Sequence, residues 1–272
     1  MMISNIRCIV SDLDGTLLMP DHSLSNEVVT AIRRYTEEGG LFTIATGRPL
    51  FTAQSIIDQI GIELPVILCN GAVLATSGEV IERKSLDTAV LADMLVEAHE
   101  RGLMVLLFRE ASIEVFARNE DIEAFEHKES VTCTLVSITD SDWRTGELEK
   151  VILLGELDRI EALWSHWASQ LHNVVEKFQS EPHYVELISA EASKGKALER
   201  LSELLGIDRQ SMMAIGNQMN DLPMLQAAGV GVAVANSPDE LKSAAHYVCT
   251  ASYGTGVIEA INQLAYGRST NL

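Results

Sequence analysis

The sequence predicts an α/β fold in which a doubly wound parallel sheet carries a second, α+β domain as an insertion. Three observations support this fold class. Short apolar runs alternate with helical patterns at both ends of the chain, as in a parallel sheet with helices on both faces. Between residues 83 and 190 the pattern changes to many strand-like runs with two helical stretches. The length of 272 residues suffices for two ordinary domains.

The N-terminal part of the chain alternates strands and helices. The run at residues 6–10 is rich in branched apolar side chains, which suits a strand buried on both faces. From Ser25, a good N-cap residue, apolar residues recur at helical spacing until Gly39 and Gly40 end the pattern. The order then repeats, with strands expected at 41–45 and 65–71 and a helix at 52–60.

The C-terminal part repeats this order, with helices expected within 193–206, 219–229 and 238–245 and strands within 211–217, 230–236 and 246–249. In the middle segment, helices are expected at 88–101 and 157–171, and strands at 103–108, 112–117, 132–137, 150–155, 174–179 and 183–189. We therefore expect residues 1–82 and 191–272 to form one domain and residues 83–190 another.

Composition excludes several classes of partner. The formal charge of −19, from 20 Lys and Arg against 39 Asp and Glu, would repel nucleic acid. No apolar stretch is long enough to span a membrane, and the N-terminus lacks the layout of a signal peptide, so a cytoplasmic protein is expected. The four cysteines lie far apart without a CxxC pair, which favours reduced core thiols over a disulfide or metal site: Cys8, Cys69, Cys133 and Cys249.

The stretch DLDG at residues 12–15 ends the first predicted strand with two aspartates. Because Leu13 points the other way, Asp12 and Asp14 share one face, at the edge where parallel sheets bind ligands. Carboxylates this close repel each other unless a divalent cation or a shared proton compensates them. The pair therefore indicates a metal site or an acid–base pair, whereas an ordinary turn with solvated acids would need neither.

Further polar groups follow other predicted strands or begin helices at this edge. Thr46 and Gly47 offer a hydroxyl and an amide to an anion. Lys194 follows Ser193, a candidate N-cap, so its ammonium would lie at a helix N-terminus. Each feature alone has an ordinary structural explanation, but together they supply what phosphoryl transfer from an ester requires. The stretch GNQMND at 216–221 adds Asn217, Asn220 and Asp221.

Read in order, DLDGT, TGR, SKG and GNxxND resemble the four motifs of the haloacid dehalogenase-like (HAD) phosphatases. NGA at 70–72 and the stretch LPMLQAAGVGVAVANS at 222–237 extend the resemblance. The large insertion between the second and third motifs is similar to the type 2 cap of the Cof-type branch. The resemblance implies a Rossmann-like core and an inserted cap domain that acts as a folded lid and selects small substrates.

The resemblance also implies residue roles. Asp12 would be the nucleophile that forms an aspartyl-phosphate, and Asp14 would protonate the leaving oxygen and then activate water. Mg²⁺ would be held by Asp12, the main-chain carbonyl of Asp14 and Asn217. Asp221 would share the metal, orient Lys194 or orient a metal-bound water. The phosphoryl contacts would be the Leu13 amide, the Thr46 hydroxyl, the Gly47 amide, Lys194 and Asn220.

One position departs from the usual pattern. The family commonly has aspartate at position 217, and an amide oxygen carries no full charge. Metal binding is then weaker, or Asp221 shares the metal, or the protein binds phosphates without turning them over. A phospho-accepting receiver domain is a further alternative, although receivers are shorter and their acidic residues at the first strand are adjacent.

The function expected from these patterns is Mg²⁺-dependent hydrolysis of small phosphorylated metabolites. The resemblance implies sugar phosphates or phosphorylated cofactors, such as pyridoxal phosphate or flavin mononucleotide. A small-molecule phosphate ester is thus the expected partner, with neither nucleic acid nor a membrane, and the oligomeric state is left open. His22, His127 and His183 are expected to be surface or packing residues without a role in the site.

Overall fold

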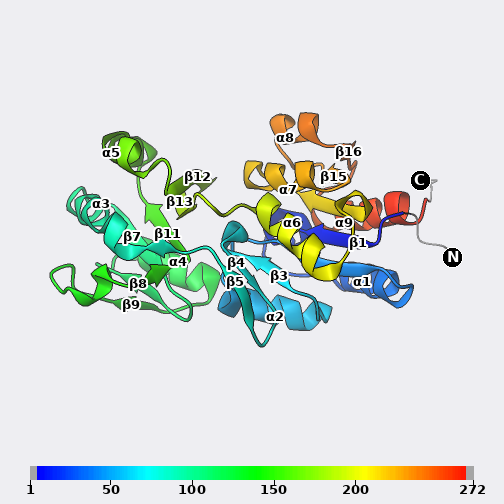
Figure 1. Ribbon diagram of the computed structural model, residues 1–272, viewed down its shortest axis with the longest axis horizontal. Helices are drawn as coiled ribbons and strands as arrows, with labels where there is room; N and C mark the ends of the chain where they lie inside the picture. The colour runs from blue at the N-terminus through cyan, green and yellow to red at the C-terminus, as the bar shows by residue number, and fades with distance from the viewer. Residues whose placement is uncertain (1–4, 268–272) are drawn as a thin grey trace. The chain divides into compact units, whose positions relative to one another are not determined.

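The structure, a computed structural model of the chain, describes residues 5–267 (Figure 1). The chain divides into two compact units: unit 1 comprises Met1–Glu82 and Ser193–Leu272, and unit 2 comprises Arg83–Ala192. The predicted fold class is confirmed, because unit 1 contains a parallel sheet with helices and unit 2 combines a mostly antiparallel sheet with helices.

Unit 1 is built on a parallel sheet with the strand order β16-β15-β14-β1-β2. A parallel bridge between Ala45 and Ile67 places β3 beside β2, and β3 pairs antiparallel with β4, which pairs with β5. Because β1 lies between β14 and β2, the loops that follow these strands meet at one edge. The strands are β1 (Cys8–Ser11), β2 (Leu41–Ile44), β3 (Val66–Leu68), β4 (Val73–Ala75), β5 (Val80–Arg83), β14 (Met212–Gly216), β15 (Val230–Ala233) and β16 (Tyr247–Val248).

Helices pack on this sheet and bury its apolar side chains. Cys8 and Val10 of β1 share a core with Leu198 of α6 and Leu225 of α7, and α1 packs beside α9 (Figure 1). The helices of unit 1 are α1 (Asn26–Glu37), α2 (Leu50–Ile60), α6 (Lys194–Leu205), α7 (Leu222–Ala227), α8 (Asp239–Ala244) and α9 (Tyr253–Ala260). Tight turns or short helical segments occur at Leu13–Leu17, Cys69–Gly71, Arg209–Ser211, Met219–Asp221 and Ile261–Ala265.

Helix α1 shows how the local sequence sets these elements. Ser25 caps it, because its side-chain oxygen accepts a hydrogen bond from the Val28 amide (3.3 Å). Tyr35 is fully buried, and its hydroxyl donates to the Ile6 carbonyl (3.1 Å). The chain leaves the helix through Gly40, where a Cβ would lie 2.3 Å from the Tyr35 ring. The helix predicted after Ser25 is therefore confirmed.

Unit 2 contains a sheet with the order β12-β13-β11-β7-β8-β9, antiparallel except for the β8–β9 pair. Helices α3 and α5 cover one face around a shared apolar core, and α4 packs on the other through Phe125, edge-on to Phe108. The elements are β6 (Leu86–Asp87), α3 (Thr88–Glu100), β7 (Met104–Phe108), β8 (Ile113–Val115), α4 (Glu120–Glu129), β9 (Cys133–Leu135), a turn at Asp142–Arg144, β10 (Glu147–Leu148), β11 (Lys150–Leu154), α5 (Leu157–Leu171), β12 (Val175–Glu181) and β13 (Tyr184–Ser189).

Most predicted elements recur with small changes at their ends, but α4 was not predicted from the sequence. Its sequence is dominated by charged residues, and it buries only Ile122 and Phe125. An N-cap hydrogen bond from the Ile122 amide to the Asn119 side chain (3.1 Å) begins it.

All four cysteines are buried free thiols, as predicted. Among residues 5–267, no helix is both long and apolar enough to cross a membrane.

Candidate active site

The loop after β1 places Asp12 at the edge of the unit 1 sheet. Asp12 precedes the tight turn Leu13–Leu17, in which Gly15 adopts a left-handed φ of 79°. A Cβ at Gly15 would lie 2.3 Å from the Asn217 amide nitrogen, so only glycine permits this close approach to the loop after β14. Asn236, which follows β15, donates a hydrogen bond to the Gly15 carbonyl (2.8 Å). Neighbouring strand ends therefore fix the loop that carries Asp12.

Lys194 lies between two aspartates. Its Nζ donates to Asp12 Oδ1 and to Asp221 Oδ1, each at 2.6 Å. All three side chains are buried, with exposed fractions of 0% for Lys194 and Asp221 and 8% for Asp12. Two carboxylates and one ammonium leave a net charge of −1 in a place where unpaired charge is costly. With both aspartates ionised the arrangement favours binding of a further cation, and a proton on Asp12 would compensate the same charge.

The pKa values follow from this burial. Burial raises the pKa of Asp12 to about 7, and repulsion from Asp221 adds to the rise while Lys194 opposes it. For Lys194, burial disfavours the charged form, but the two aspartates outweigh burial and raise its pKa. Lys194 is thus a permanent positive charge at neutral pH, whereas full ionisation of Asp12 requires additional positive charge nearby.

Asp221 holds the turn after β14. Its Oδ2 accepts hydrogen bonds from the amides of Asn217 (2.8 Å) and Gln218 (3.0 Å), while its Oδ1 accepts from Lys194. Both carboxylate oxygens thus face donors of the protein. Among the roles expected for Asp221, this geometry favours orienting Lys194 over ligating a metal directly.

The side-chain amide of Asn217 faces oxygen atoms of the Asp12 loop and has two possible orientations. With Oδ1 turned toward the loop, it accepts a hydrogen bond from the Thr16 hydroxyl (3.1 Å). With Nδ2 in the same place, the amide donates to Asp12 Oδ2 and to the Asp14 carbonyl oxygen, at 3.2 Å each. Only the first orientation presents three oxygens to a cation.

The donor set fits Mg²⁺. Adjacent oxygens around an octahedral Mg²⁺ with bonds of about 2.1 Å lie roughly 3 Å apart. The inward atom of the Asn217 amide lies 3.2 Å from Asp12 Oδ2 and 3.2 Å from the Asp14 carbonyl oxygen, which is close to this spacing. Within residues 5–267, no three His, Cys, Asp or Glu side chains form a metal cluster. The candidate donors are instead a carboxylate oxygen of Asp12, the main-chain carbonyl of Asp14 and the amide oxygen of Asn217, all suited to a hard cation.

The Asp14 side chain is turned toward Arg48 and His22. Arg48 donates two hydrogen bonds, from Nε to Oδ2 (2.8 Å) and from Nη2 to Oδ1 (2.7 Å), and His22 Nδ1 lies 3.0 Å from Oδ1. Burial alone would raise the pKa of Asp14, but Arg48 and His22 outweigh it and hold the pKa below its ordinary value. In this position Asp14 is ionised at neutral pH.

The contacts of Asp14 with Arg48 and His22 were not predicted from the sequence. Arg48 belongs to the TGR motif, and this membership is the signal that could have identified it. His22 was expected to have no role, yet its ring contacts Asp14. Its backbone is left-handed, with a φ of 62°, and its amide donates to the Met19 carbonyl (2.9 Å). No local sequence pattern marks such a contact, because it depends on how the loop folds back.

The remaining expected phosphoryl contacts come from separate loops. Thr46 is buried after β2, and its hydroxyl accepts a hydrogen bond from the Arg48 amide (3.1 Å). Asn220 donates to the side chain of Asn70, which in turn packs against Gly47. The side chain of Leu13 is fully buried, so the contact expected from this residue could come only from its main-chain amide.

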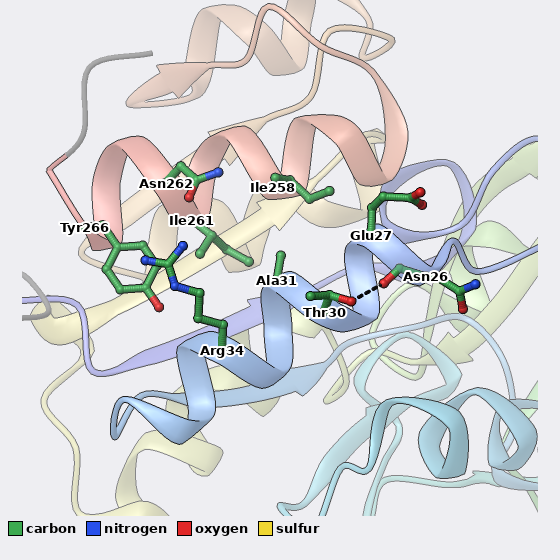
Figure 2. A pocket seen from close by; sticks show the side chains of 9 residues that line it. All are labelled: Asn26, Glu27, Thr30, Ala31, Arg34, Ile258, Ile261, Asn262 and Tyr266. Atoms are coloured by element: carbon green, nitrogen blue, oxygen red, sulfur yellow. Dashed lines mark hydrogen bonds between the residues drawn. The ribbon is translucent and has the colours of Figure 1, made fainter. Parts of the chain in front are cut away.

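A surface hollow of about 400 Å³ lies between α1 and the C-terminal segment formed by α9 and Ile261–Ala265. Figure 2 shows the side chains that line it. Arg34 lies over the ring of Tyr266 at 4.9 Å from its centroid, and Ile258 and Ile261 line the opposite wall. None of the side chains that line this hollow belongs to the four motifs. The candidate active site is therefore the edge around Asp12, not this hollow.

Known proteins resemble the chain over most of its length. A sequence model of haloacid dehalogenase-like hydrolases matches residues 9–261. YxeH of Bacillus subtilis is 32% identical over 277 residues, covering 96% of this chain and 99% of YxeH. The 5-amino-6-(5-phospho-D-ribitylamino)uracil phosphatase YwtE of B. subtilis is 27% identical over 294 residues, covering 97% of this chain and 99% of YwtE.

The solved structures agree with this result. A haloacid dehalogenase-like hydrolase from B. subtilis superposes with a TM-score of 0.84 at 26% identity, covering 95% of this chain and all of that protein (100%). The family match spans all four motifs, from the strand before Asp12 to beyond Asp221, which leaves no place for the receiver alternative. The family predicted from the sequence is confirmed: the chain belongs to the haloacid dehalogenase-like hydrolases, in the Cof-type branch.

Proposed function

We propose that this protein is a Mg²⁺-dependent phosphatase that hydrolyses small phosphate esters through an aspartyl-phosphate on Asp12. The observation that carries the proposal is the buried Lys194 between Asp12 and Asp221, next to three oxygens that face one another. This arrangement holds a carboxylate ready to attack, a fixed positive charge for the phosphoryl oxygens and a place for a cation.

The first half-reaction transfers the phosphoryl group to the protein. A carboxylate oxygen of Asp12 attacks phosphorus, and the bond between phosphorus and the leaving oxygen breaks. Protonated Asp14 gives its proton to this oxygen, so the product leaves as an alcohol. Lys194, the Thr46 hydroxyl and Asn220 would contact the phosphoryl oxygens, where negative charge is concentrated.

The second half-reaction returns the protein to its starting state. Asp14, now ionised, accepts a proton from water, whose oxygen attacks phosphorus in the aspartyl-phosphate. The acyl phosphate bond breaks, which releases inorganic phosphate and restores the Asp12 carboxylate. When bound by Asp12, the Asp14 carbonyl and Asn217, Mg²⁺ would offset the negative charge of the nucleophile and of the phosphoryl group.

The contacts of Asp14 add a condition to this scheme. Paired with Arg48 and His22, the carboxylate is ionised and has no proton to give. We infer that Asp14 leaves Arg48 and takes up a proton before the first half-reaction. Rotation about its side-chain bonds would move the carboxylate away from Arg48 without moving the main-chain carbonyl of Asp14.

The substrate class follows from the family and from one relative. YwtE is named for a substrate that carries a phosphate ester, and we propose small metabolites of this type, including sugar phosphates and phosphorylated cofactors. We further propose that unit 2 sets the preference among them. Replacing residues 83–190 with a short linker should then change the ranking of substrates more than it changes metal binding by unit 1.

The test is release of inorganic phosphate from p-nitrophenyl phosphate and from a panel of metabolite phosphates, with and without Mg²⁺. Steady release that requires Mg²⁺ is expected. Asp12→Asn should abolish turnover while the melting temperature stays near that of the wild type, because shape is kept and the nucleophile is lost. Full activity of this variant would overturn the role of Asp12.

The departure at position 217 favours a second candidate, a protein that binds phosphate esters but turns them over poorly. The amide of Asn217 brings no charge to the metal site. Saturable binding of phosphate esters without release of inorganic phosphate from any member of the panel would support this candidate over the phosphatase.

A further inference from the structure

The turn Cys69–Gly71, which follows β3, has an unusual backbone. Cys69, Asn70 and Gly71 have φ values of 47°, 56° and 97°, so three consecutive residues are left-handed and two of them are not glycine. Non-glycine residues in this region cost of order 1 kcal/mol or more each and persist where the surroundings enforce them. Asn70 is also buried, with 3% of its surface exposed. Such strain calls for a compensating role.

The turn contacts the loops that carry three of the four motifs. The Asn70 amide donates to the Thr46 carbonyl (3.0 Å), and the Cys69 amide donates to the Arg48 carbonyl (3.1 Å). A Cβ at Gly71 would lie 2.2 Å from the Ser193 carbonyl oxygen, so the turn lies directly against the residue before Lys194. Loops distant in sequence are thus held in register by this one turn.

The side chain of Asn70 links two expected phosphoryl contacts. Its Oδ1 accepts a hydrogen bond from Asn220 Nδ2 (2.9 Å). Its amide group also lies flat against Gly47, since a Cβ at Gly47 would be 3.1 Å from Nδ2 and 3.3 Å from Oδ1 of Asn70. The absence of a side chain at Gly47 therefore leaves room for the Asn70 amide, which in turn accepts the hydrogen bond from Asn220.

We propose that Asn70 is a positioning residue that orients the Asn220 amide toward the phosphoryl group. This inference rests on the proposed function, in which Asn220 is a phosphoryl contact. An amide nitrogen carries two N–H groups in one plane, so donation of one to Asn70 fixes the direction of the other. Without Asn70, the Asn220 amide can rotate and present either its nitrogen or its oxygen. Its oxygen would repel a phosphoryl oxygen, so both binding and turnover weaken.

The test is a double-mutant cycle with Asn70→Gly, Asn220→Ala and the double variant. Glycine accepts the left-handed backbone, so Asn70→Gly removes the side chain without adding strain. Ser130→Gly is the matched control, because Ser130 is also left-handed (φ 55°) but caps α4 in unit 2. The measurements are kcat/KM on p-nitrophenyl phosphate, the dissociation constant of inorganic phosphate, and the melting temperature.

We expect Asn70→Gly to lower kcat/KM and phosphate affinity about tenfold, as loss of one orienting hydrogen bond predicts. The double variant should be no worse than Asn220→Ala, because Asn70 acts through Asn220. Ser130→Gly should leave both values unchanged. Additive losses in the double variant, or a loss that only follows the melting temperature, would overturn the proposal.

A second measurement separates this inference from the proposed function. The side-chain amide protons of Asn220, assigned by their absence in Asn220→Ala, should exchange slowly with solvent in the wild type and rapidly in Asn70→Gly. If the wild type neither binds phosphate nor hydrolyses esters, the proposed function fails. Unchanged exchange in Asn70→Gly would overturn the role of Asn70 whatever the activity.

Discussion

The two units of the chain bury charged side chains in different ways. In unit 2, Lys150 of β11 donates to Glu186 of β13 at 3.0 Å, with 5% and 8% of their side chains exposed. The Lys150 ammonium also lies 4.6 Å from the ring centroid of Phe108. In unit 1, Lys194 faces two carboxylates, and the Asn217 amide faces further oxygens nearby.

This difference distinguishes a structural ion pair from a site prepared for a ligand. Between β11 and β13, the positive charge of Lys150 and the negative charge of Glu186 compensate each other. Around Lys194 the negative charge exceeds the positive charge, and the excess lies at the edge where the loops of a parallel sheet meet. Buried charge that is left unbalanced by the protein indicates where a cation and an anionic substrate bind.

The largest expected effect separates the two lysines. Lys194→Met should lower kcat/KM by about a thousandfold or more, since it removes the fixed charge beside the phosphoryl group. Lys150→Met should destabilise the protein by about 3–5 kcal/mol, because it removes the ammonium that the buried Glu186 carboxylate faces, with kcat/KM per folded molecule unchanged. Urea unfolding and p-nitrophenyl phosphate kinetics measure the two effects. A similar loss of activity in both variants would contradict the distinction.

A double substitution tests whether the unit 2 pair is only structural. Lys150→Met combined with Glu186→Leu replaces the pair with apolar groups and should recover most of the stability lost in Lys150→Met, to within about 1 kcal/mol of the wild type. Chemical denaturation of the single and double variants gives the comparison. If stability is not recovered, the Glu186 carboxylate makes other interactions in the sheet that leucine cannot replace.

Asn217→Asp increases the excess of negative charge in unit 1, because it adds a carboxylate beside the proposed cation site. At an effective dielectric well above that of a dry interior, a gain of about 1–2 kcal/mol in Mg²⁺ binding is reasonable. The Mg²⁺ concentration for half-maximal activity should then fall roughly tenfold. The maximal rate need not rise, because a more negative site also repels the ester.

Asp221→Asn is the companion variant in the same Mg²⁺ titration. Because both Asp221 oxygens face protein donors, it should change the maximal rate more than the Mg²⁺ requirement. A requirement that rises greatly in Asp221→Asn and stays unchanged in Asn217→Asp would make Asp221 the metal ligand.

The smallest expected effect concerns the partly exposed Asp14–Arg48 pair, whose side chains are 38% and 15% exposed. Arg48 helps to hold the pKa of Asp14 below its ordinary value, so the pair stabilises the fold above the unfolded pKa and loses this effect as the pH falls through the folded one. Arg48→Gln should therefore cost about 0.5–1 kcal/mol at neutral pH, where screening by solvent limits the value.

This cost should shrink as the pH falls below about 4, where Asp14 takes up a proton in the unfolded chain, and should vanish below its lower pKa in the folded wild type. Urea unfolding across this range is the measurement. Arg209→Gln, which removes an exposed pair with Glu199, is the matched control for loss of a surface arginine. A cost for Arg48→Gln that is independent of pH would show that Asp14 is not the group stabilised.

The sequence predicted the fold class and most elements because their signals are local. The cap at Ser25 and the helix at 157–171 are set by neighbouring residues, and both recur in the structure. Helix α4 was missed because its stability comes from packing of Ile122 and Phe125 on the sheet, not from a strong apolar stripe. Local patterns cannot report such tertiary support.

The candidate site divides in the same way. Motifs at strand ends predicted that Asp12 and Asp221 lie close together, because a parallel sheet brings its strand ends together, and the N-cap at Ser193 predicted that Lys194 begins a helix. Two other contacts join separate loops: His22 with Asp14, and Asn220 with Asn70. They could not be predicted, because the direction of each side chain depends on the backbone conformation of its loop. Both His22 and Asn70 have a left-handed backbone conformation. Histidine and asparagine can adopt this conformation, but their presence in a sequence does not predict it.

The two orientations of the Asn217 amide have a consequence for the stability of the protein without a bound cation. With its nitrogen turned inward, the amide can satisfy the oxygens of Asp12 and Asp14 by itself, so loss of the cation leaves no unpaired acceptors. An aspartate at this position could not do so. Treatment with a chelator should therefore leave the melting temperature of the wild type nearly unchanged and lower that of Asn217→Asp. If Mg²⁺ binds here as proposed, asparagine at 217 binds it more weakly than aspartate would and leaves the empty site more stable.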